Sequence, residues 1–523
     1  MDSNEGCRDV SIESKRYSAR IGHLDERIGH LDERIGSLDA RTTSLETHLT
    51  RNADRVGWSN CCKADNMTII EGIAERIGAI SFSDLPPEAV DWAKVAILDT
   101  VGVTLAGAGE PCAQIVERVL AGNSAGECLI FGTDRRAAPL DAALINGTAS
   151  HALDFDDVSN SLGGHPSAPI LPALFALAET LDSNGREFIA AYVAGFETET
   201  RIARGVNFHH YDKGWHPTAT LGVFGATAAC AHLMRLDRAK TAHALAIAAS
   251  LASGIKANFG TMTKPLHVGH TARSGLFAAQ LAREGFTANP EALEHKQGFL
   301  LVFNGAGNFD AEAILKDWGQ PYDIVRPGLA VKQHPCCGST HPAVDAMLQL
   351  RAEHEIAPAR VARIDSWTHP RRLAHTDRPD PQSGLDAKFS VQYCLARALL
   401  QGRIALEDFE GEAFRDPASR ALMRHIHAAP HPEMNASSDE HLGAEIRITF
   451  DDGRTIARRV GSALGRGPDN PLPAAALAAK FANCAARALP PAQVANVQRM
   501  LLQLDEAASL RAVVAAIAKP PDR

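Results

Sequence analysis

The sequence lacks a long apolar run, and this absence argues against a membrane-spanning helix. The longest alanine-rich candidate, residues 243–255, falls short of the roughly 18 apolar residues that a bilayer span needs. The first twenty residues contain four acidic side chains and no apolar core, which fits neither a secretory signal nor an acid-poor transit peptide. We therefore expect a cytoplasmic protein without a membrane partner.

Positive charge is also scarce. The chain has 53 Lys and Arg residues against 62 Asp and Glu residues, which gives a formal net charge of -9. A nucleic-acid surface would need clustered basic residues, so we expect no nucleic-acid partner. An anionic substrate would have to be held by local cations.

Cysteine motifs are missing, although the chain contains ten cysteines. The adjacent pairs Cys61-Cys62 and Cys336-Cys337 do not have the CxxC spacing of zinc or redox sites, so reduced thiols are the simpler interpretation. No glycine-rich phosphate loop and no cysteine set for an iron–sulfur cluster is visible. We therefore predict a reaction that uses no cofactor and no metal.

Residues 20–47 contain a seven-residue repeat that begins RIGHLDE-RIGHLDE. Its apolar positions alternate in steps of three and four, as in the seam of a coiled coil. Glycines at 22, 29 and 36 each weaken a helix by about 1 kcal/mol relative to alanine. We predict that residues 1–65 form a separate extension, either a short coiled coil or a flexible segment.

The chain of 523 residues is too long for one ordinary core, and its 45% hydrophobic and 22% charged residues are typical of globular proteins. Residues 66–330 are dense in small residues that let helices pack closely, and they predict a large all-helical domain. The helices that we expect there span residues 86–105, 168–181, 218–236, 240–255 and 271–284.

From residue 331 the pattern changes. Residues 445–450 alternate strictly before an Asp-Asp-Gly turn and a second run at 454–460, which predicts a β-hairpin. With a strand at 361–368 and a helix at 390–400, residues 331–465 predict a smaller α+β lid domain. Residues 466–523 regain helical periodicity at 474–489 and 491–518, so we expect them to return to the helical domain. The predicted fold class is mostly α.

Acidic, basic and glycine residues gather in residues 151–167. We expect Asp154, which has apolar neighbours, to face inward, whereas Asp156 and Asp157 are typical of a solvated helix end. His151 with Asp154 also resembles part of a metal site, but the other ligands of a metal hydrolase do not follow at fixed spacing.

Further candidate residues lie in 209–217, 263–270, 332–342 and 386–393. His216 precedes one helix and Lys264 stands at the entrance of another, where helix N-termini and lysine both favour anions. Taken singly, each segment has a structural explanation that is at least as good. Tyr393, for example, could be a core aromatic and Lys388 a surface charge.

Taken together and in this order, the segments resemble the MmgE/PrpD family over about residues 66–520. The motifs are ILDTVGVTLAG at 97–107, NGTASHALDFDD at 146–157, GGHPSAPILPAL at 163–174, GWHPTATLGVFGA at 214–226, TKPLHVGHTARSG at 263–275, HPCCGSTHPAVDA at 334–346, DAKFSVQY at 386–393 and DNPLP at 469–473. The resemblance implies a helical domain with a smaller lid, a homodimer, and an active site between the two domains. Carried over by motif, the catalytic residues are Asp154, His165, His216, Lys264, His341 and Tyr393.

These residue types suit acid/base chemistry on an anion. Removing a proton beside a carboxylate needs a base of near-neutral pKa and cations that neutralise the growing charge. His165, His216 and Lys264 can supply both, His341 or Tyr393 could donate a proton, and Asp154 could orient a histidine.

The reaction class leaves several alternatives open. Our first expectation is a lyase that acts on a small polycarboxylic acid, similar to 2-methylcitrate dehydratase. A lyase similar to cis-aconitate decarboxylase is the closest alternative, and an epimerase of the iminodisuccinate type is third. From other classes, the chain could be a helical scaffold protein with a vestigial site, or a metal hydrolase.

Overall fold

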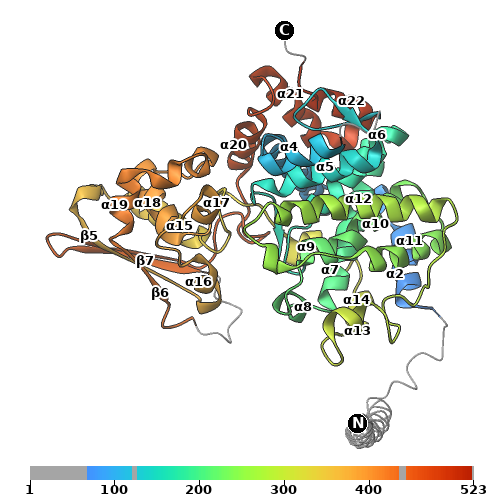
Figure 1. Cartoon of the computed structure of the whole chain (residues 1–523), viewed down its shortest axis with the longest axis horizontal. Helices are drawn as coiled ribbons and strands as arrows, with labels where there is room; N and C mark the ends of the chain where they lie inside the picture. Colours follow the sequence, from blue (N-terminus) through green and yellow to red (C-terminus); the bar gives the residue numbers. More distant parts are fainter. Residues whose placement is uncertain (1–66, 121–125, 435–442, 521–523) are drawn as a thin grey trace, which may run out of the picture. The chain divides into compact units, whose positions relative to one another are not determined.

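The computed structural model describes residues 67–120, 126–434 and 443–520, and these are mostly helical. The extension that we predict at residues 1–65 lies outside the described residues. The first helices, through the large helical region shown in Figure 1, are α2 (Ile69–Ala79), α3 (Pro87–Gly107), α4 (Pro111–Leu120), α5 (Pro139–Ala152), α6 (Ser167–Leu181), α7 (Gly185–Arg204), α8 (His209–Asp212), α9 (Pro217–Thr220), α10 (Gly222–Leu233), α11 (Arg238–Leu251), α12 (Thr263–Arg283), α13 (Phe299–Asn304) and α14 (Glu312–Leu315).

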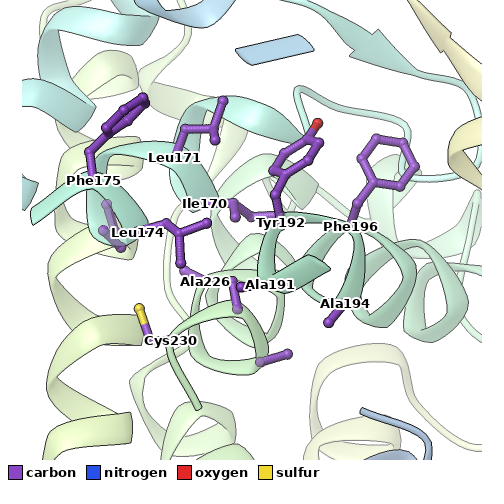
Figure 2. Packing of buried hydrophobic residues seen from close by; sticks show 14 of the residues in the cluster. Ile170, Leu171, Leu174, Phe175, Ala191, Tyr192, Ala194, Phe196, Ala226 and Cys230 are labelled. Atoms are coloured by element: carbon purple, nitrogen blue, oxygen red, sulfur yellow. The ribbon is translucent and has the colours of Figure 1, made fainter. Parts of the chain in front are cut away.

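One hydrophobic core unites these helices, and alanine is its most frequent residue. Figure 2 shows Ile170 and Leu174 of α6 packed near Ala191 and Tyr192 of α7, with Ala226 of α10 close by. The three C-terminal helices contribute to the same core; they are α20 (Ala474–Ala485), α21 (Pro491–Leu502) and α22 (Leu510–Ile517). In the described ranges, no helix has both the length and the apolar character of a membrane span.

Helices α5 and α12 pack against each other through glycine, and this contact positions the candidate site. A Cβ at Gly147 of α5 would lie 2.8 Å from the Cα of Gly269 in α12, a separation too short for any side chain. The close approach brings the C-terminal end of α5, with His151, to the N-terminal end of α12, with Lys264. Helix–helix contact without side chains therefore sets the distance between these two residues.

A second hydrophobic core lies against a four-stranded sheet whose strand order is β6-β5-β7-β8. β5 (Val361–Thr368) runs parallel to β6 (Ile426–Pro430) and antiparallel to β7 (Ala444–Phe450), which pairs with β8 (Thr455–Val460). Burial alternates along β7, as expected for a strand with one covered face. The helices of this region are α15 (His341–Glu353), α16 (Pro370–Thr376), α17 (Gly384–Ala387), α18 (Val391–Gln401) and α19 (Pro417–Met423).

The predicted hairpin at 445–460 and the predicted strand at 361–368 are confirmed. Some predicted helices end or break differently. In place of one helix at 218–236, the chain forms α9 and α10, which are separated at Leu221, and α10 ends at Leu233. α12 begins eight residues before the predicted start at 271. The fold class is mostly α, as predicted, and the domain boundaries at 330 and 465 stay predictions.

Candidate active site

The loop at residues 153–166 joins α5 to α6 and is held by tight contacts. Asp154 has a left-handed backbone, with φ of 53°, which aspartate tolerates better than most residues. Gly164 lies so close to Thr218 that a Cβ would be 2.7 Å from Thr218 Oγ1, and this hydroxyl accepts the backbone N–H of His165 at 3.0 Å. The loop therefore presents Asp154 and His165 in fixed positions.

Three lysines bind successive carbonyl groups of this loop. Lys388, Lys332 and Lys480 donate from Nζ to the carbonyl oxygens of residues 153, 154 and 155 at 2.6, 2.6 and 2.8 Å. All three side chains are buried, so the surface position considered for Lys388 is wrong. The carbonyl oxygens replace water as partners, which lets the charges leave the solvent. Lys332 was not among the predicted catalytic residues, although its place after the apolar residues 329–331 could have indicated burial.

Asp154 is the centre of an ion-pair cluster. Its Oδ1 lies 2.8 Å from Lys264 Nζ, 3.3 Å from Lys332 Nζ and 3.5 Å from His165 Nε2. Burial acts to raise the pKa of Asp154, but the charges of Lys264 and Lys332 hold it well below its usual value. Asp154 is therefore ionised at neutral pH and faces inward, as predicted.

Two histidines share the carboxylate of Asp156. His151 Nδ1 lies 2.8 Å and His165 Nδ1 lies 3.1 Å from Asp156 Oδ2, and the two rings meet edge to face at 4.5 Å. Burial lowers the pKa of His151 to about 4, so its ring is neutral at pH 7 and donates Nδ1–H to the carboxylate. Asp156 therefore orients the His151 ring by a hydrogen bond and lies at ion-pair distance from the His165 ring.

The prediction that Asp156 and Asp157 form a solvated helix end is wrong, because both side chains are fully buried. Asp157 accepts the hydroxyl of Ser167 and, at 3.3 Å, its backbone N–H. Burial raises the pKa of Asp157 well above its usual value, while the bonds from Ser167 oppose the shift. The loop folds inward because its acids find partners there, a feature that local sequence does not reveal.

His216 stands at the start of α9 beside other rings. Its Nδ1 lies 3.3 Å from Nδ1 of His267, so one ring donates and the other accepts. Phe259 meets the His216 ring edge to face at 4.9 Å. Burial, and after it the nearby charge of Lys264, lowers the pKa of His216 well below its usual value. A neutral imidazole is therefore available at this position.

Four of the six predicted residues line one cavity of about 810 Å³, namely Asp154, His165, His216 and Lys264. An adjoining cavity of about 380 Å³ shares Asp154 and Lys264. Neither cavity is lined by the other two predicted residues. His341 Nε2 lies 3.2 Å from the carbonyl oxygen of Cys336, and the hydroxyl of Tyr393 donates to the carbonyl of Asp408 at 2.5 Å.

A group of donor atoms in the site could hold a metal ion. One ligand atom from each of His151, Asp154, Asp156 and His165 lies within 4.8 Å of the others. However, Lys264 and Lys332 already compensate the charge of Asp154, and an ammonium group disfavours a second cation at the same oxygen. These four residues would fit a metal ion only if Asp154 gave up its contacts with Lys264 and Lys332 and bound the ion in their place.

Comparisons with known proteins match both parts of the chain. The family model described as the MmgE/PrpD N-terminal domain matches residues 71–312, and the MmgE/PrpD C-terminal domain matches residues 334–506. The cis-aconitate decarboxylase of Mus musculus is 30% identical over 406 residues, which cover 75% of this chain and 82% of that protein. The cis-aconitate decarboxylase of Aspergillus terreus is 26% identical over 450 residues, covering 82% and 91%. The 2-methylcitrate dehydratase of Cupriavidus necator is 26% identical over 445 residues, covering 77% and 87%.

Proposed function

Because this chain belongs to the MmgE/PrpD family and is a lyase, we propose that it decarboxylates a small tricarboxylate of the cis-aconitate type without a cofactor. The comparisons favour this alternative over our first expectation, a 2-methylcitrate dehydratase. The mammalian decarboxylase is 30% identical to the chain, whereas the dehydratase of Salmonella typhimurium is 25% identical over 394 residues.

The observation that carries the proposal is the placement of two lysines and His165 around Asp154, with His216 on the wall of the same cavity. Lys264 uses one N–H on Asp154 and has further N–H groups for a substrate carboxylate. Neutral His216 can exchange a proton, or donate a hydrogen bond, without adding charge to the site.

Decarboxylation makes a specific demand on these groups. The bond between the departing carboxylate and its substrate carbon breaks, the electron pair stays on that carbon, and a proton takes the place of CO₂. Cations beside this carbon stabilise the electron pair as it spreads toward a neighbouring carboxylate of the substrate. We assign this role to Lys264 and Lys332, and the proton to His165, which lines the cavity and contacts both Asp154 and Asp156.

Dehydration of a 2-methylcitrate-like substrate is the second candidate, because relatives with that name match most of the chain. It would need a base that removes a substrate proton and an acid that protonates the departing hydroxide. A homodimer and a cytoplasmic location remain our predictions, as do the catalytic roles of His341 and Tyr393.

Product identification tests the proposal. The purified full chain is incubated with cis-aconitate, 2-methylcitrate and citrate in separate samples, and the products are followed by NMR. We expect loss of CO₂ from cis-aconitate, and a variant in which His165→Gln and Lys264→Ala are combined should abolish it. Water loss from 2-methylcitrate with no change in cis-aconitate would select the dehydratase instead.

A further inference from the structure

The cavity of about 810 Å³ carries more positive than negative side chains. Its wall includes two carboxylates, from Asp154 and Asp386, and six cationic side chains, from Lys256, Lys264, Lys332, Arg372, Arg378 and Arg466. Lys264 and Lys332 contact Asp154, and Arg378 contacts Asp386. Within the described part of the chain, no carboxylate lies at ion-pair distance from Lys256, Arg372 or Arg466.

Arg372 and Arg466 line the same cavity, although they come from different segments. Arg372 belongs to α16, and Arg466 follows β8 in the loop that leads to α20. Burial, and after it the like charge of Arg466, lowers the pKa of Arg372 to about 10. Cys337 and Gly338 line the same cavity as these two arginines.

Arg466 is also linked to the ion-pair cluster. A Cβ at Gly338 would lie 3.6 Å from Arg466 Nη1 and 3.9 Å from Lys332 Cε, so these two side chains flank the same glycine. The missing side chain at Gly338 leaves space between them. Arg466 Nη2 donates to Asn160 Oδ1 at 3.0 Å, whereas its buried Nε has no hydrogen-bond partner.

Two half-buried guanidinium groups of like charge, without a carboxylate between them, are costly unless an anion joins them. Guanidinium groups bind carboxylates in a bidentate geometry that lysine cannot reproduce. We place the reacting end of the substrate at the Asp154 cluster, whose Lys332 side chain flanks Gly338. A tricarboxylate has further carboxylates that could reach the arginines.

We propose that Arg372 and Arg466 bind a non-reacting carboxylate of the substrate and set a preference for tricarboxylates over dicarboxylates. This inference rests on the proposed function for the class of substrate. It adds two residues that no sequence motif had singled out.

Binding measurements on the parent protein and its variants test the inference independently of catalysis. Tricarballylate and glutarate share a five-carbon chain and differ by the central carboxylate, and calorimetry measures the affinity of each for the full chain. We expect the parent protein to prefer tricarballylate by between about ten- and a hundredfold, the range for a hydrogen bond to a charged group. In the double variant Arg372→Met/Arg466→Met, the preference should fall to near one.

Matched variants separate this role from a structural one. Arg403→Met changes an exposed arginine outside the cavity and should keep the full preference. Arg372→Lys and Arg466→Lys keep the charge but lose the bidentate geometry, so each should show a several-fold reduced preference. They also serve as the test if the methionine variants do not fold. An unchanged preference in folded variants at both positions would overturn the inference.

Steady-state kinetics distinguishes failure of the inference about the two arginines from failure of the proposed function. If the parent protein decarboxylates cis-aconitate, the methionine variants should raise KM about tenfold or more with little change in kcat. An unchanged KM would overturn the inference and leave the function standing. If no tricarboxylate reacts but tricarballylate binding depends on both arginines, the inference stands and the function fails.

Discussion

Replacement of Lys264 by alanine is the sharpest test of the site. Lys264 Nζ lies 2.8 Å from Asp154 Oδ1 and 5.3 Å from the centre of the Phe259 ring, at the first turn of α12. Loss of one preorganised charge contact commonly removes about 3 to 4 kcal/mol of transition-state stabilisation. We therefore expect Lys264→Ala to reduce turnover by a factor on the order of hundreds.

The same substitution should affect folding much less. Removing one partner of a buried ion pair can cost about 3 to 5 kcal/mol, because the other charge is left uncompensated. Here Lys332 Nζ remains 3.3 Å from the same carboxylate oxygen, so Asp154 keeps a cation. The melting temperature should consequently change little.

Steady-state kinetics on the substrate found by NMR, with a thermal melt beside it, measures both effects. Lys240→Ala is the control, because Lys240 is half-buried, lies outside the cavity, and donates from Nζ to the carbonyl oxygen of Arg283. Lys264→Arg retains the charge and should recover part of the activity. Turnover and KM near those of the parent protein in Lys264→Ala would show that the cation takes no part in the reaction.

Three further predictions concern other parts of the chain. Deletion of residues 1–60 should leave turnover intact, because these residues lie outside every family motif; a folded but inactive truncated protein would contradict this. Activity should survive treatment with a metal chelator, since the groups assigned to the reaction are side chains. A stoichiometric metal ion, with activity lost on chelation and regained when the metal is added back, would refute this prediction. Asp157→Asn should raise the melting temperature at pH 7 but not near pH 4. The folded state raises the pKa of Asp157, so its ionisation costs stability as pH rises above the unfolded value of about 3.9. Melts that show the same gain at both pH values would contradict that reasoning.

Short-range patterns determined much of the fold. The hairpin of β7 and β8 follows from strict alternation and the turn at residues 451–453, where Gly453 has φ of 82°. The helix α6 begins within one residue of the predicted start and ends where predicted. The motifs and their order also indicated the family and the four cavity residues Asp154, His165, His216 and Lys264. They could do so because this sequence has the family's residue types at the matching motif positions.

Only the tertiary structure decided which charges are buried. Lys480 reaches the carbonyl of Phe155 across 325 residues, and Lys388 reaches Leu153 across 235, so no local periodicity could reveal these contacts. The placement of Arg372 and Arg466 at one cavity depends in the same way on how α16 and the loop after β8 pack. Periodicity reports which face of a helix or strand is apolar, whereas the burial of a charge depends on a partner that folding brings from elsewhere in the chain.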